Sequence, residues 1–113
     1  MILPTGATTF AEGLRYAAET YSSLKKVIST KFGPGSVNVG DEGGFGAPEI
    51  GNEFESLDIV MEAIKAAKME GKITIGMDVA ASEFYDEGKY NMGWKTKETG
   101  KLFSGDDMIN RYN

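Results

Sequence analysis

Apolar residues recur between positions 10 and 28 at steps of three and four residues, a spacing that places them on one face of a helix. Thr9 and Glu12 form a T-x-x-E capping box ahead of this stretch, and Gly33-Pro34-Gly35 follows it as a stop signal. The pattern predicts a helix that begins near Thr9, ends before Gly33 and buries one apolar face. The residues of that face are Phe10, Leu14, Ala17, Tyr21, Leu24 and Ile28.

A second amphipathic stretch follows a glycine-rich segment. Asn52, with Glu55 three residues later, predicts its N-terminal cap, and Gly71 predicts its end. Its apolar positions also recur at helical spacing and predict a single buried face. They are Leu57, Val60, Met61, Ile64 and Ala67.

Residues 72–81 come directly after this second helix. Their β-branched and apolar composition predicts a buried strand. The apolar residues 1–4, which run into a Thr-Gly turn, predict the end of an earlier strand. The order strand, helix, helix, strand is that of an α/β protein.

The remaining stretch carries turn and cap signals. Glu87-Gly88 predicts a small hairpin, and we interpret Trp94 as a hydrophobic anchor on a loop. Ser104 and Asp107 predict the start of a third helix that is still in progress at Asn113. We therefore expect an α/β segment that starts at the end of a strand and stops within a helix.

Composition excludes several classes of function. The chain has 113 residues, with 12 Lys and Arg against 17 Asp and Glu, and its net charge of −5 argues against a nucleic-acid module. It contains no Cys and no His, which excludes thiolate metal sites and His-containing triads or zinc sites within it. No apolar run approaches the roughly 20 residues of a membrane span, and no basic leader is present. We expect a soluble, cytoplasmic protein.

The first candidate site is the segment Gly40-Asp41-Glu42-Gly43-Gly44. A glycine-rich loop often cradles phosphate, but this one lacks the lysine of a P-loop and carries two carboxylates at its centre. Two negative charges would repel a phosphate, so the loop suits proton transfer or a hard cation better. The alternative is a solvated surface turn, because Asp and Gly favour turns in any case.

The second candidate is Asp78, which interrupts the predicted strand near its C-terminal end. A buried carboxylate without a partner loses several kcal/mol of solvation, so it should be paired, protonated or bound to a metal. Functional side chains of parallel α/β folds also gather at the C-terminal ends of strands. The alternative is a carboxylate that simply accepts hydrogen bonds from a neighbouring loop.

Three segments in one order and spacing resemble the enolase family. They are MILPTGA at 1–7, NVGDEGGF at 38–45 and IGMDVAASEFY at 75–85, and the resemblance extends to about residue 93. It implies that residues 1–113 form part of a C-terminal catalytic domain, an eight-stranded TIM-like α/β barrel that begins β-β-α-α. Such a barrel needs about 250 residues, so the barrel would be incomplete at both ends.

The resemblance also implies a chemistry, the Mg²⁺-dependent dehydration of 2-phosphoglycerate to phosphoenolpyruvate in glycolysis. Glu42 matches the family's acidic residue that helps to protonate the departing hydroxide, which is a poor leaving group without an acid. Asp78 matches the first of three carboxylates that hold the main Mg²⁺. The other two carboxylates, the proton-abstracting lysine and the catalytic histidines of the family have no counterpart in these 113 residues. The family further implies a homodimeric full-length protein with a small-molecule substrate.

One departure from the family pattern falls next to the first candidate site. Gly46 is an additional residue, and Glu49 stands where the family has Asn. Gly46 would add a flexible joint close to Glu42. The alternative to an enolase domain is a truncated, non-catalytic chain that acts as an interaction or antigenic module, and in either case we expect the 113 residues alone to be inactive.

Overall fold

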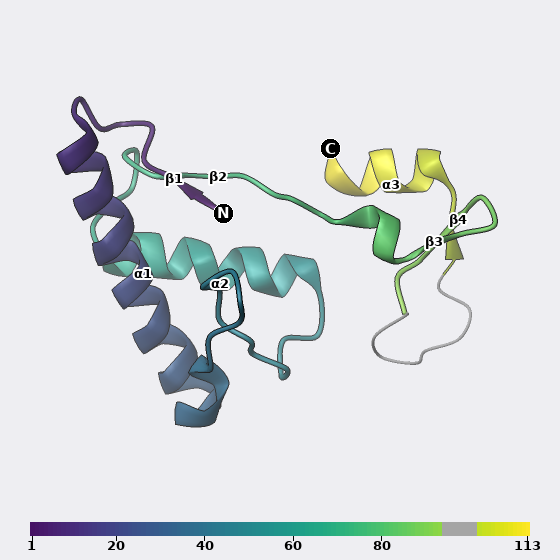
Figure 1. The fold of residues 1–113 in the computed structure, drawn as a ribbon, viewed down its shortest axis with the longest axis horizontal. Helices are drawn as coiled ribbons and strands as arrows, with labels where there is room; N and C mark the ends of the chain where they lie inside the picture. The colour runs from purple at the N-terminus through teal and green to yellow at the C-terminus, as the bar shows by residue number, and fades with distance from the viewer. Residues whose placement is uncertain (94–101) are drawn as a thin grey trace. The chain divides into compact units, whose positions relative to one another are not determined.

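The computed structural model describes residues 1–93 and 102–113, and these form two compact units, Met1–Gly76 and Met77–Asn113 (Figure 1). Each unit is described here by itself. The predicted anchor Trp94 lies outside the described residues. The first unit contains β1 (Ile2–Leu3), α1 (Phe10–Phe32), a 3₁₀ turn (Pro34–Val37), α2 (Glu53–Ala66) and β2 (Thr74–Ile75). The second contains a 3₁₀ turn (Ala81–Glu83), β3 (Tyr85–Asp86), β4 (Lys89–Asn91), β5 (Leu102–Phe103) and α3 (Gly105–Tyr112).

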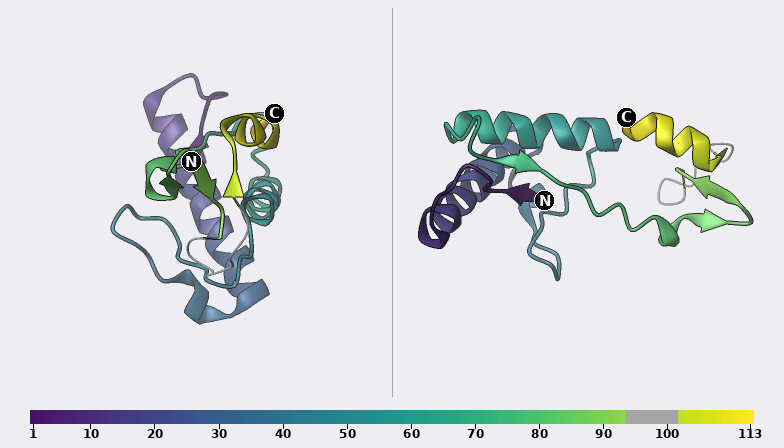
Figure 2. Two further views of the ribbon diagram at one scale, coloured as in Figure 1. Left: turned by 90° about the vertical axis from the view of Figure 1, so that its right-hand side faces the viewer. Right: turned by 90° about the horizontal axis from the view of Figure 1, so that it is seen from above.

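In the first unit two helices cross and pack on each other, and Ile2 and Ile75 of the paired strands pack against their core (Figure 2). Strands β1 and β2 are antiparallel, with Ile2 opposite Ile75. The order strand, helix, helix, strand is therefore as predicted. The buried residues at the centre of this unit come from both helices and from the turn before β2, and they are Tyr16, Ile64, Met69 and Ile73.

Helix α1 begins at the predicted cap, but the Glu12 side chain bonds to a different backbone N–H from the one that a capping box predicts. The Thr9 hydroxyl accepts a hydrogen bond from the Glu12 N–H at 3.2 Å, as the motif predicts. The Glu12 carboxylate instead accepts from the N–H of Thr8 at 2.8 Å and from the Tyr16 hydroxyl at 2.6 Å. These hydrogen bonds lower the pKa of Glu12 from 4.5 to about 2, with the Thr8 N–H as the largest cause. The helix start is confirmed, while the return bond lies one residue earlier than in the standard box.

The predicted buried face of α1 is largely wrong. Phe10 is 86% exposed and Leu14 is 59% exposed in the first unit. The buried positions of the helix lie on an overlapping stripe, and only Ile28 belongs to both. Apolar spacing identifies a helix, but the packing partner decides which stripe it covers, and here the core contains Tyr16. The buried positions are Gly13, Tyr16, Thr20 and Ile28.

Helix α2 begins where it is predicted and ends earlier than predicted. The Asn52 side chain accepts from the Glu55 N–H at 3.0 Å, which confirms the cap. The helix ends at Ala66, Ala67 is its C-cap, and Lys68, the next residue, adopts a positive φ of 57°. Gly71, with φ 73°, makes the later turn into β2 and does not end the helix. Of the predicted face, Ile64 is buried but Met61 is 54% exposed.

The predicted buried strand at 72–81 is also wrong over most of its length. Only Thr74–Ile75 is a strand, and residues 76–80 have no regular structure. The ladder ends with the Gly76 N–H, which donates to the Met1 carbonyl at 2.9 Å. A strand needs a partner along its whole length, and β1 pairs with it over two residues only. Met77 and Val79 are consequently exposed in the second unit.

The second unit is a small antiparallel sheet with one helix. Strand β4 pairs with β3 and with β5, and the turn at Glu87-Gly88 has positive φ at both residues, as a type I′ hairpin requires. The predicted hairpin is confirmed. Ser104 and Asp107 form a complete capping box at the start of α3, which is also as predicted. The pairing of β5 with β4 is a feature that the residue pattern does not predict.

The described strands form a two-stranded and a three-stranded sheet, and they do not close a barrel. The mixed helices and strands fit the predicted α/β class. None of the helices in the described ranges is long and apolar enough to cross a membrane.

Candidate functional site

Glu42 lies at the tip of a narrow hairpin-like loop in the first unit. Val39 and Phe45 form an antiparallel bridge at its base. The Gly43 N–H donates to the Gly40 carbonyl at 2.9 Å, so that Asp41 and Glu42 are the two central residues of a tight turn. Both acidic residues are exposed. The glycine-rich segment is therefore an ordered turn that presents a carboxylate to solvent.

Two contacts join this loop to helix α1. The Tyr21 hydroxyl donates to the carbonyl of Gly43 at 2.9 Å. The Tyr21 ring also stacks on Phe45, with ring centroids 4.6 Å apart and an interplanar angle of 27°. Tyr21 is part of the predicted helix face, but nothing in the helical spacing indicates these contacts with a loop. The feature that could have suggested them is the single aromatic residue, Phe45, within a run of glycines.

The additional residue Gly46 belongs to the same hairpin. Its N–H donates to the Asn38 carbonyl at 2.8 Å and extends the ladder beyond the Val39–Phe45 bridge. Its φ lies outside the positive range that favours glycine, and a Cβ there would meet only the Asn38 oxygen at 3.8 Å. The hydrogen bond ties Gly46 to the base of the loop, which argues against the expected flexible joint at this position.

Asp78 lies in the irregular stretch that opens the second unit, and it is exposed. The expectation of a carboxylate on a buried strand is wrong, because the strand ends at Ile75. One oxygen, Oδ1, accepts a hydrogen bond from the Ala80 N–H at 3.1 Å. Ala80 has a positive φ of 50°, so the side chain of Asp78 braces a sharp local turn.

A metal needs more ligands than Asp78 offers. A carboxylate oxygen is the donor type that Mg²⁺ prefers, so the residue fits the ion chemically. Within residues 1–93 and 102–113, however, no three acidic side chains gather as a metal site would require. Glu42 and Asp78 belong to different units, so each is described in its own unit alone.

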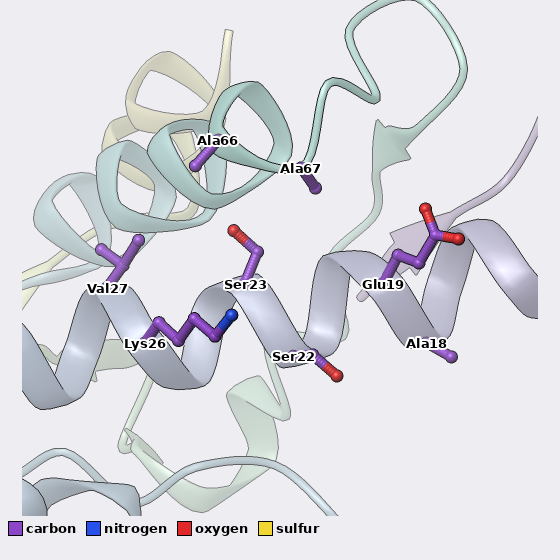
Figure 3. Close-up of a pocket in the computed structure, with 8 residues that line it drawn as sticks. All are labelled: Ala18, Glu19, Ser22, Ser23, Lys26, Val27, Ala66 and Ala67. Atoms are coloured by element: carbon purple, nitrogen blue, oxygen red, sulfur yellow. The ribbon is translucent and has the colours of Figure 1, made fainter.

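A separate hollow lies between α1 and α2 and contains neither candidate residue. Figure 3 shows Ser23 and Val27 on the side of α1 that faces Ala66 and Ala67 of α2. The hollow has a volume of about 540 Å³ and is open to solvent. Small side chains at a helix crossing explain it without a ligand.

Comparison with known proteins defines the class of domain first. Residues 1–113 match the family described as "Enolase, C-terminal TIM barrel domain", which agrees with the α/β order of the elements. The chain is also 53% identical to a protein named "Enolase" from Mastigamoeba balamuthi over 118 aligned residues. That match covers 99% of this chain and 27% of the relative, so the chain spans about a quarter of the relative's length. The chain belongs to the enolase family, in its C-terminal TIM barrel domain.

Proposed function

We propose that this chain is part of a Mg²⁺-dependent enolase, a glycolytic lyase that dehydrates 2-phosphoglycerate to phosphoenolpyruvate. One observation supports this proposal above the others. In a chain that belongs to the enolase family, the Asp41-Glu42 turn is held by backbone hydrogen bonds and presents its carboxylates to solvent.

Glu42 is proposed as the acid that helps the hydroxide leave. Hydroxide is a poor leaving group, and a positioned carboxylic acid contributes typically 10²- to 10⁴-fold to such a step. Proton transfer requires the carboxyl group within hydrogen-bond reach of the departing oxygen. An exposed side chain at a braced turn can meet a substrate, whereas a side chain buried in the core of the unit could not. Asp41, its neighbour in the turn, is assigned no chemical role.

Asp78 is proposed as one of several carboxylate ligands of Mg²⁺. When bound, the ion offsets the negative charge that develops at the substrate carboxylate. Asp78 is exposed, and its Oδ1 is engaged by the Ala80 N–H. That hydrogen bond orients the carboxyl group relative to the local turn at Ala80, as hydrogen bonds from neighbouring groups orient metal ligands. The residue contributes one ligand, and the remainder must come from other parts of the complete enzyme.

The finer features of the proposal follow from the same family. We propose that residues 1–113 form part of one catalytic barrel domain with a β-β-α-α opening, and the antiparallel pairing of β1 and β2 supports it. An even number of helices between two strands fits strands that run in opposite directions. We also infer a cytoplasmic, homodimeric enzyme with no nucleic-acid partner, in keeping with a net charge of −5.

The first test replaces Glu42 in a full-length enolase that carries this segment. Glu42→Gln keeps the size of the side chain but removes its acidic proton, so kcat should fall by about 10²- to 10⁴-fold. Mg²⁺ affinity, measured by titration calorimetry, should not change. Glu87→Gln is the matched control, since Glu87 is an exposed acid in the hairpin of the other unit. Full turnover by the Glu42→Gln enzyme would remove Glu42 from the reaction.

The second test concerns the metal. In the same full-length enzyme, Asp78→Ala should weaken Mg²⁺ binding by at least tenfold in calorimetry, as loss of one carboxylate ligand implies. Asp86→Ala, at an exposed position on β3, is the control. The 113-residue chain itself should form no phosphoenolpyruvate above background at saturating Mg²⁺. Unchanged Mg²⁺ affinity in Asp78→Ala would exclude this residue as a ligand.

A further inference from the structure

We propose that Tyr21 is a positioning residue for Glu42, holding the acidic turn from helix α1 through its hydroxyl and its ring. This inference rests on the proposed role of Glu42 as the acid. It adds to that role a residue that lies 22 positions from Gly43 in the sequence and never needs to touch the substrate.

The loop cannot fix its own orientation. Its hydrogen bonds from Gly40, Gly43 and Gly46 all end on other residues of the segment 38–46. Such bonds define the shape of the hairpin, but they leave it free to swing as a unit about its base. Four of the seven residues from Gly40 to Gly46 are glycines, which increases that freedom. A bracing contact therefore has to come from outside the segment.

Tyr21 supplies two such contacts, one near the tip of the hairpin and one at its base, and both lie after Glu42 in the sequence. Its hydroxyl donates to the carbonyl of Gly43, the residue that directly follows Glu42. Its ring stacks on Phe45, which forms the bridge at the base of the hairpin. One side chain thereby restrains both the tip and the base of the hairpin. Tyr21 stands on a helix whose neighbouring turn contributes Tyr16 to the core, so the brace starts from a rigid element.

The geometry predicts how much each of the two contacts of Tyr21 contributes to kcat. Because a misplacement of about 1 Å at a reacting group can reduce a rate by about 10²-fold, loss of the brace should act on kcat. Tyr21→Phe removes the hydroxyl and keeps the stack, whereas Tyr21→Leu removes both. We expect kcat to fall by about threefold in the first variant and by about 30-fold in the second, with KM for substrate nearly unchanged in each.

The test uses two independent measurements. In the 113-residue chain, NMR hydrogen exchange of the Gly40 and Gly43 amides should accelerate about threefold in Tyr21→Phe and at least tenfold in Tyr21→Leu. Exchange of the Ile64 amide within α2 should not change, which separates a loosened loop from a loosened core. Tyr85→Phe is the control, because Tyr85 is 53% exposed in the other unit and its ring packs on Tyr90. Unchanged exchange in Tyr21→Leu would overturn the proposal.

In a full-length enolase that carries this segment, the decisive variant combines Tyr21→Leu with Glu42→Gln. If Tyr21 acts through Glu42, the double variant should be no slower than Glu42→Gln alone. A further loss equal to that of Tyr21→Leu alone would overturn the positioning role and leave a merely structural one. If Glu42→Gln itself keeps full turnover while the loop amides still respond to Tyr21, the proposed function of Glu42 fails and the brace stands as a structural contact.

Discussion

The two units of the chain differ most in how much of their structure rests on a buried core. The first unit buries side chains from both of its helices and from the turn before β2. In the second unit, as far as the structure describes it, α3 contributes one buried residue, Met108, to a sheet whose strands are two or three residues long. The two candidate acids follow this division. Glu42 is presented by a loop that is braced against α1, while Asp78 stands in an irregular stretch with one hydrogen bond to Ala80.

This difference bears on how each acid could be placed for chemistry. A loop braced from a packed helix can hold its tip in one position within its own unit. An irregular stretch with one local hydrogen bond cannot, and it depends on whatever packs against it in the complete protein. We therefore expect the Glu42 turn to be the better ordered of the two candidate positions in the 113-residue chain.

The largest expected effect comes from removing core volume in each unit. Ile64→Ala should lower the free energy of unfolding of the first unit by about 2–5 kcal/mol, because Ile64 is 2% exposed and its truncation removes buried apolar volume from the core. Met108→Ala should leave that transition unchanged and loosen the second unit alone. Urea unfolding followed residue by residue with NMR distinguishes the units. If each variant lowered the stability of both units equally, the division of the chain into two separately stabilised units would be contradicted.

A smaller effect is expected from two glycines with nearly the same backbone angle. Gly43 in the acidic loop has φ 81°, and Gly88 in the β3–β4 hairpin has φ 82°. Alanine at either position is strained by about 1–2 kcal/mol, because a Cβ disfavours this region. Gly46→Ala is the control and should be nearly neutral, since its φ is not in that range. Hydrogen exchange near each site measures the change, and equal effects at all three positions would show that local strain is not the cause.

The smallest expected effect is a loss of stability at acid pH. In each unit this loss arises from one carboxylate near the N-terminus of a helix. The Thr8 N–H and the Tyr16 hydroxyl lower the pKa of Glu12 to about 2 in the first unit. Hydrogen bonds from the Ser104 hydroxyl and N–H lower the pKa of Asp107 in the second. A lowered pKa stabilises the fold above the ordinary pKa, and that contribution is lost as the pH falls through the lowered value.

The first unit should therefore lose stability as the pH falls below about 4.5, the ordinary pKa of Glu12, and the second as the pH falls below about 3.8, the ordinary pKa of Asp107. Glu12→Gln should flatten this dependence in the first unit, and Asp107→Asn should flatten it in the second. Thermal unfolding at a series of pH values between 6 and ~2 measures both. If Glu12→Gln leaves the slope of the first unit unchanged, its hydrogen bonds to Thr8 and Tyr16 do not persist in solution.

The sequence predicts local features of the fold well and distant ones poorly. Thr9, Asn52 and Ser104 are each found at the cap they predict, because a cap needs only the residues beside it. The exposure of Phe10 and the early end of the strand at Ile75 were not predictable in this way. Both depend on which partner a helix stripe or a strand finds, and that partner is distant in sequence.

The candidate site shows the same limit. The glycine and acid pattern predicts that Glu42 lies on a loop, and the structure confirms a turn there. The brace from Tyr21 was not predictable, since the helical spacing assigns Tyr21 to an apolar face and says nothing about Gly43. Whether Asp78 binds a metal stays a prediction, because the other ligands it needs do not gather within the described residues.

The pairing of β1 with β2 has a consequence for the order in which the first unit folds. Its outermost contact joins Met1 to Gly76, which are 75 positions apart. Both helices consist of contacts between near neighbours, whereas closing so long a loop loses entropy that only the completed pairing repays. We expect the helices to form before the strands meet, and the strand pair to be the part of this unit that opens first.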